Sequence, residues 1–169
     1  MAALTLRRLA ILAVLVATLP SALAQPKKDI KQSEQATRAL ATWLESDDFE
    51  PRRLAPVTKL GQLVVPSLAA ALERGPSPAK RELVRRSVAA DYEALDRGAR
   101  PASARPLRSK SDFTRHYLAN FDALYRIRAA QALGAIGGPS ARKALEGALP
   151  KAPRDDVRTV IEQVLKQVP

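Results

Sequence analysis

Apolar residues recur at helical spacing between Ser109 and Leu149. Ser109 and Asp112 form a capping box at the start of this stretch, and neither glycine nor proline follows until Gly134. The aromatic side chains lie four residues apart, with alanines and leucines beside them: Phe113, Tyr117, Phe121 and Tyr125. The pattern predicts one long helix from Lys110 to Ile136. The alternative is a break at Asn120-Phe121-Asp122, where Asp122 would cap a new helix.

Glycines end this predicted helix and a proline begins the next one. Gly134, Gly137 and Gly138 supply a permissive backbone, and Pro139 suits the first position of a second helix over residues 139–149. The stretch is therefore expected to form a helical hairpin. We expect its aromatic row to pack in a core, because aromatic stripes at helical spacing usually do so; lining a ligand groove is the alternative.

Similar periodicity predicts further helices on both sides of the hairpin. Residues 25–32 are polar and aperiodic, so we expect a mobile N-terminal arm there. Helices are expected over 33–45, 51–60, 63–73, 78–95 and 153–167. Pro56 should kink or shorten the second of these. The fourth should bury the stripe Val84, Val88, Tyr92 and Leu95. No alternating strand pattern of useful length occurs, so the predicted fold class is all-α with about seven helices.

A basic cluster lies between the two longest predicted helices. Residues 98–108 combine prolines, a glycine and arginines, which is typical of an exposed linker. The cluster spans this linker and the following helix start: Arg97, Arg100, Arg105, Arg108, Lys110 and Arg115. Only Asp112 opposes it. A second basic run consists of Lys80, Arg81, Arg85 and Arg86. Such cations either solubilise the surface or bind an anionic partner.

The first 24 residues have the order of a secretory signal peptide. Arg7 and Arg8 precede an apolar run over residues 9–19, and Ala22-Leu23-Ala24 places cleavage before Gln25. An uncleaved membrane anchor is the alternative, but the run is shorter than the roughly 20 residues that a spanning helix needs. We therefore expect an exported protein, periplasmic or secreted, whose helical domain covers residues 33–169.

Composition narrows the chemistry of this expected domain. The 169 residues suit one domain, and the chain has no cysteine, which excludes disulfides, thiolate metal ligands and a cysteine nucleophile. Without Arg7 and Arg8, 26 basic residues face 17 acidic ones, a net charge of about +9. This charge favours anionic partners, such as lipid headgroups, glycans, nucleic acid or an acidic protein surface. Export argues against genomic DNA.

Titratable side chains offer little for catalysis. His116 is the only histidine and has no histidine-rich context, so we interpret it as a solvated helix residue. Asp47, Asp48 and Glu50 could bind a cation, but acidic residues are favoured before a helix start in any case. We therefore expect no enzymatic activity, no metal and no cofactor.

A weak internal repeat gives the most specific resemblance. At a spacing of 32 residues, Tyr125-Arg126 aligns with Val157-Arg158, Gln131 with Gln163, and Leu133 with Leu165. The run from Tyr125 to Gly137 resembles a HEAT repeat of the phycobilisome-lyase-like type, in which an apolar residue and an arginine precede an alanine-rich helix and Leu-Gly. The resemblance is good over residues 125–165, fair over 54–95 and absent in the linker. Lys166 departs from it, where the last copy would have glycine.

The resemblance implies a short HEAT-like α-solenoid after a cleaved signal peptide. It also implies a non-enzymatic scaffold that binds an unidentified protein in the periplasm or cell envelope, although some HEAT-like proteins look like bilin lyases or DNA glycosylases. An irregular helical bundle is the alternative fold. The alternative function is peripheral binding of anionic lipid or polysaccharide through the basic cluster.

Overall fold

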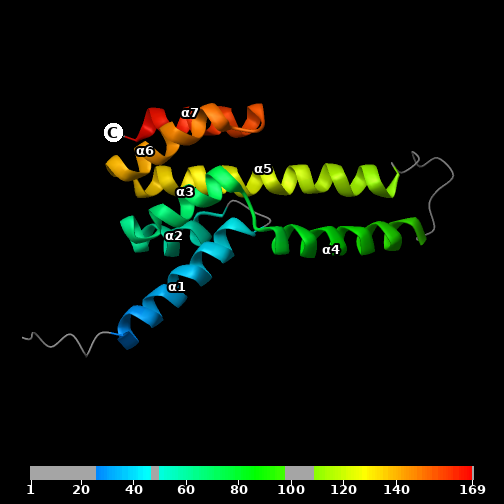
Figure 1. Cartoon of the computed structure of the whole chain (residues 1–169), viewed down its shortest axis with the longest axis horizontal. Coiled ribbons are helices and arrows are strands. Elements are labelled where there is room, and N and C mark those ends of the chain that lie inside the picture. Colours follow the sequence, from blue (N-terminus) through cyan, green and yellow to red (C-terminus); the bar gives the residue numbers. More distant parts are fainter. Residues whose placement is uncertain (1–25, 47–49, 98–108, 169) are drawn as a thin grey trace, which may run out of the picture. The chain divides into compact units, whose positions relative to one another are not determined.

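The computed structural model describes residues 26–46, 50–97 and 109–168, and this part of the chain is helical without any strand. The prediction of an all-α fold is confirmed. The elements are α1 (Pro26–Leu44), α2 (Pro51–Leu60), η1 (Gly61–Val64), α3 (Val65–Arg74), α4 (Pro78–Arg97), α5 (Lys110–Ile136), α6 (Gly138–Ala148), η2 (Leu149–Lys151) and α7 (Asp155–Gln167) (Figure 1). Contacts divide the chain into residues 1–35 and a second unit, 36–169, which holds the core and the grooves described below. The expected signal peptide over 1–24 and the linker over 98–108 lie outside the described residues.

Helix α5 is continuous from Lys110 to Ile136, as its sequence predicts. The Ser109 hydroxyl accepts a hydrogen bond from the backbone N–H of Asp112 at 3.2 Å, which satisfies an amide that the helix start leaves unpaired. Gly137 ends the helix with a φ of 67°, a conformation that favours glycine. No break occurs at Asp122, so the cap at Ser109 and the stop at Gly137 define the whole element.

The C-terminal half of α5 is the centre of the core. Ala129, Ala130, Ala132 and Leu133 are completely buried there, and α3, α6 and α7 pack against this helix. Small side chains allow close approach: a Cβ added at Gly134 would overlap the Cγ1 of Val164 in α7. The alanine-rich repeat therefore serves to bring helices together closely.

Trp43 joins the end of α1 to this core. The side chain is only 2% exposed, and its Nε1–H donates a hydrogen bond of 2.9 Å to the backbone carbonyl of Arg128 in α5. A buried indole needs such an acceptor, because its N–H would otherwise lose its hydrogen bond to water. The contact joins segments 85 residues apart in the chain.

The predicted boundary of the first helix is wrong. Helix α1 begins at Pro26, inside the segment that we expected to be an N-terminal arm. The fixed φ of proline suits the first helical position, and the Lys and Gln residues that follow are good helix formers. These residues have no apolar stripe, which is the feature on which the prediction depended.

The segment Pro51–Arg74 is helical throughout. Gly61 ends α2 with a φ of 54°, but the 3₁₀ turn η1 leads directly into α3, and Pro56 does not shorten α2. Because no gap separates α2, η1 and α3, this described segment can be counted as one helix or as two. The expected number of about seven helices is therefore not decided. By length and composition alone Arg52–Arg74 could cross a membrane, with a mean hydropathy of 1.2. Of this stretch 28% is buried within the protein, including Val57, Val64 and Leu68, which belong to the hydrophobic core.

The aromatic row of α5 is not a core stripe along its whole length. Phe113, Phe121 and Tyr125 are half-buried, and Tyr117 is 47% exposed. Two ring pairs form, Tyr92 with Phe113 at 5.5 Å between centroids and Phe121 with Tyr125 at 6.1 Å. The predicted stripe of α4 is likewise incomplete: Val88 is buried, Val84 and Tyr92 are half-buried, and Leu95 is 53% exposed. Figure 1 shows the reason, since α4 and the N-terminal half of α5 run side by side beyond the other helices of this unit.

Candidate binding site

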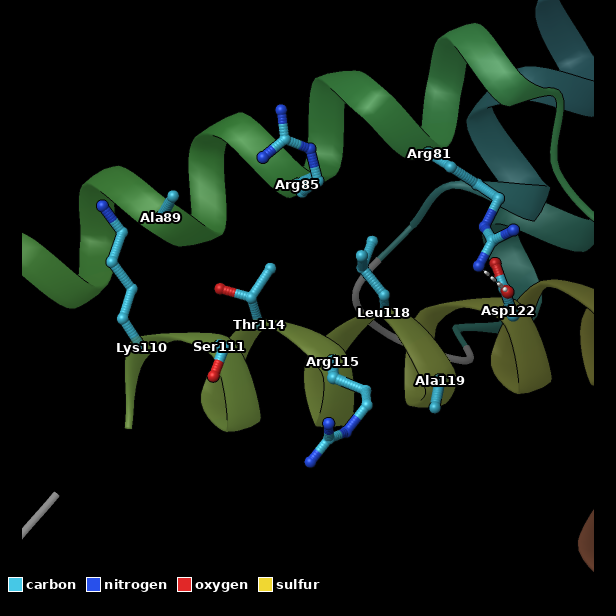
Figure 2. A pocket seen from close by; sticks show the side chains of 10 residues that line it. All are labelled: Arg81, Arg85, Ala89, Lys110, Ser111, Thr114, Arg115, Leu118, Ala119 and Asp122. Atoms are coloured by element: carbon cyan, nitrogen blue, oxygen red, sulfur yellow. Dashed lines mark ion pairs between the residues drawn. The ribbon is translucent and has the colours of Figure 1, made fainter. Parts of the chain in front are cut away.

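A groove of about 700 Å³ lies between α4 and the N-terminal half of α5 (Figure 2). We call it the α4–α5 groove. Helix α4 contributes Arg81, Arg85 and Ala89, and α5 contributes Lys110, Thr114, Leu118 and Asp122, among others. Residues three or four apart share one face of a helix, so each helix presents a row of side chains to the groove. Ser77 caps the start of α4, because its hydroxyl accepts a hydrogen bond of 3.2 Å from the N–H of Lys80.

A second and larger groove, of about 1010 Å³, continues from the first. It is lined by α1, α3, the turn after α3, α4 and α5, and it shares Arg81, Arg85, Leu118 and Asp122 with the α4–α5 groove. We call it the Arg126 groove, after the arginine of α5 that lines it. The two grooves are therefore neighbours along α4 and α5.

The structure brings together parts of both basic runs that the sequence shows. Lys110 and Arg115, from the predicted cluster, line the α4–α5 groove together with Arg81 and Arg85, from the second run. Arg97 is exposed at the end of α4, where its Nε donates to the carbonyl of Glu93 at 3.1 Å. The other three predicted residues, Arg100, Arg105 and Arg108, lie outside the described residues.

Carboxylates offset much of this positive charge. Four ion pairs involve the basic residues of the groove: Lys110 with Glu93, Arg115 with Asp112, Arg85 with Glu82 at 2.7 Å, and Arg81 with Asp122 at 3.0 Å. The sequence had suggested that Asp112 alone opposes the cluster. That expectation is wrong because Glu93, far from Lys110 in the chain, reaches it from the opposite helix.

The basic partners lower the pKa values of two of these carboxylates. Hydrogen bonds from Arg85 and then Arg86 lower the pKa of Glu82 to about 2. The hydrogen bond from Lys110 lowers the pKa of Glu93. Both carboxylates are therefore ionised at neutral pH, and each pairs with a cation that lines the groove, Glu82 with Arg85 and Glu93 with Lys110.

The Arg81–Asp122 ion pair links α4 to α5 where the two grooves join, and Figure 2 shows it as a dashed line. One turn further along α5, the Arg126 Nη1 donates to the backbone carbonyl of Asp122 at 3.3 Å. The guanidinium of Arg126 lies against Gly75, where a Cβ would come within 2.7 Å of Nη1. Gly75 has a φ of 75°, so both its conformation and this contact favour glycine.

Two arginines of α5 were not recognised as special from the sequence. Arg126 is half-buried in the larger groove, and Arg128 is only 2% exposed. Both belong to the repeat motif, which was used to assign the fold and not to find a site. An arginine inside an otherwise apolar helical pattern is the signal that could have found them, since such a residue needs a polar environment when buried.

The remaining candidate residues are not brought together. His116 is exposed on α5, with its Nε2 3.3 Å from the side-chain amide of Asn120. Glu50 pairs with Arg52, while Asp47 and Asp48 lie outside the described residues. Among the residues that the structure describes, no group of three or more metal-ligating side chains could hold an ion. The residues that line the two grooves can thus form ion pairs and hydrogen bonds with a ligand.

Comparison of the chain with protein-family models, with curated proteins and with solved structures found no match.

Proposed function

We propose that this chain is an exported, non-enzymatic scaffold that binds another protein in the periplasm or cell envelope through the α4–α5 groove. The observation that carries the proposal is the hairpin of α4 and α5. Helix α4 is described over its whole length, and Val88 is its only buried residue. A helix of 20 residues that buries so little of itself is poorly explained by stability alone.

Exposed apolar side chains on the same hairpin support a protein partner. Leu83 and Leu95 of α4 are 61% and 53% exposed, and Tyr117 of α5 also reaches solvent. None of the three lines either groove, but each adds exposed apolar surface to the hairpin, and aromatic side chains are enriched at protein interfaces. Within the groove, Ala89 and Leu118 add an apolar floor between charged walls.

We propose further that the helices of the second unit form a short HEAT-like solenoid of about seven helices with α1. The repeat positions support this, because Leu133 is buried in α5 and its counterpart Leu165 is packed against the same core from α7. A solenoid presents an extended surface for a partner, which suits a scaffold.

Peripheral binding of anionic lipid or polysaccharide is less well supported. Arg85, Lys110 and Arg115 each pair with a carboxylate of the chain itself. A surface that has neutralised itself in this way has a weaker long-range attraction for a charged membrane or glycan.

Site-specific photo-crosslinking tests the proposal. A photoreactive amino acid replaces Thr114, which lines the groove, in the full chain expressed in its own source; a second variant carries it at Thr159, an exposed position of α7. We expect a discrete, protease-sensitive adduct at position 114 that persists at high salt, and none of that mass at position 159. Equal labelling at both positions, or no protein adduct at position 114, would contradict the scaffold.

A further inference from the structure

The Arg126 groove has more positive charge than its own carboxylates can neutralise. Each of the three acidic side chains that line it is already paired: Glu45 with Lys80, Glu82 with Arg85, and Asp122 with Arg81. Arg74 and Arg126 also line the groove, and no ion pair joins either of them to a carboxylate of the described residues. The unpaired charge in the groove is therefore positive, which favours an anionic ligand.

Arg126 is held in place, but its Nε–H lacks an acceptor among the described residues. Its Nη1 contacts only a neutral backbone carbonyl, that of Asp122, and its guanidinium lies against the Gly75 backbone. Its Nε–H is buried with no hydrogen-bond partner among the described residues. A buried donor without an acceptor is costly, and most such groups in proteins are satisfied by water or a ligand. A carboxylate is the best match for a guanidinium, because it can accept two parallel hydrogen bonds.

The remaining walls indicate more than a single carboxylate. Leu40, Ala70 and Leu118 provide apolar surface, and the hydroxyls of Ser67 and Tyr125 provide hydrogen-bonding groups. A volume of about 1010 Å³ is at the upper end of the range for small-molecule pockets and gives room for several residues of an extended chain. We infer that this groove binds an acidic peptide segment of the partner protein, with one of its carboxylates on Arg126. The inference rests on the proposed scaffold function and specifies the chemistry of the partner.

Peptide binding tests this assignment. The probe is the capped peptide Ac-Glu-Leu-Glu-Leu-Glu-NH₂, titrated into the mature full chain, with Ac-Lys-Leu-Lys-Leu-Lys-NH₂ as the control of opposite charge. We expect only the acidic peptide to bind. Arg126→Gln should weaken binding roughly tenfold, as expected for losing a charge-assisted bidentate contact, and Arg74→Gln several-fold. Lys143→Gln makes a similar change of charge on an exposed position of α6 and should leave affinity unchanged.

Two readouts keep this test separate from that of the scaffold itself. Fluorescence of Trp43 shows whether each variant is folded, and Arg74, being exposed, can be changed even if Arg126→Gln unfolds the chain. Unchanged affinity in both arginine variants, equal binding of both peptides, or displacement of the acidic peptide by phosphatidylglycerol vesicles at low and high salt alike would overturn the inference. If the adduct at Thr114 still forms while the peptide fails to bind, the scaffold stands and the acidic ligand is wrong. Loss of the adduct itself would refute the scaffold.

Discussion

Tyr125 is half-buried where α5 meets the end of α1. Burial raises the pKa of its hydroxyl above the ordinary value of 10.0, and the nearby charge of Glu45 raises it further. Because the folded protein holds this proton more tightly than the unfolded chain does, the stabilisation is fully present below pH 10.0. It is lost as the pH rises through the higher folded-state pKa.

The expected result is a difference between the wild-type protein and Tyr125→Phe at alkaline pH. As the pH increases above 10.0, the free energy of unfolding should fall more steeply for the wild-type protein. Urea unfolding at several pH values measures this, and phenolate absorbance of the folded proteins identifies the hydroxyl that the variant lacks. Parallel curves for the two proteins would show that Tyr125 is not shielded as the structure indicates.

Trp43 shows which properties of a single residue can be predicted from the sequence. Trp43 lies within the helix predicted over residues 33–45, and its side chain is buried. Its acceptor, the carbonyl of Arg128, could not be predicted, because it lies 85 residues away and depends on how two helices meet. Burial follows from local pattern, whereas the partner follows only from the assembled fold.

At the scale of elements, two glycines in helices have opposite roles. Gly134 faces Val164 at the contact of α5 and α7, while a Cβ on Gly147 in α6 would meet nothing within 4 Å. Alanine is the better helix former by about 0.5–1 kcal/mol. At Gly134 this gain is opposed by overpacking against a stiff β-branched side chain, which costs about 1–3 kcal/mol.

We therefore expect Gly147→Ala to stabilise the protein by roughly 0.5–1 kcal/mol and Gly134→Ala to destabilise it by about 1 kcal/mol or more. Urea unfolding monitored by Trp43 fluorescence measures both. The two variants control for each other, since the chemical change is the same. Stabilisation by both would mean that α5 and α7 are packed less closely than the structure shows.

Helix boundaries were predictable where local chemistry defines them. The cap at Ser109 and the stop at Gly137 are formed by residues within a few positions, so the limits of α5 followed from the sequence. The start of α1 did not, because Pro26 opens a helix that has no apolar stripe to reveal it. The groove could not be predicted either: Arg81 and Asp122 are distant in sequence and meet only once α4 and α5 are antiparallel. The helices and their basic residues could therefore be predicted from the sequence. The carboxylates that pair with these basic residues could not, because they depend on how α4 and α5 pack together.

At the scale of the whole second unit, helix α5 divides into a buried half and an exposed half. Residues 123–136 include Ala129, Ala130 and Leu133, which are completely buried, and α3, α6 and α7 cover this part. Residues 110–118 run beside α4, which itself buries little. Local opening requires less free energy where fewer apolar side chains are buried.

Hydrogen exchange should therefore differ along a single continuous helix. Amides of α4 and of residues 110–118 should exchange at least about tenfold faster than those of residues 123–136, since the buried half opens only when the core does. Mass spectrometry of peptides from the protein measures this. The alanine-rich segment 123–136 also has the higher intrinsic helix propensity, which acts in the same direction as packing. An acidic peptide bound in the Arg126 groove contacts α4 and α5 together and should slow exchange in the hairpin, while Lys143→Gln leaves that protection intact. Uniform exchange along α5 would mean that the hairpin is as stable as the core. The hairpin would then not be the loosely packed surface that we expect a partner to stabilise.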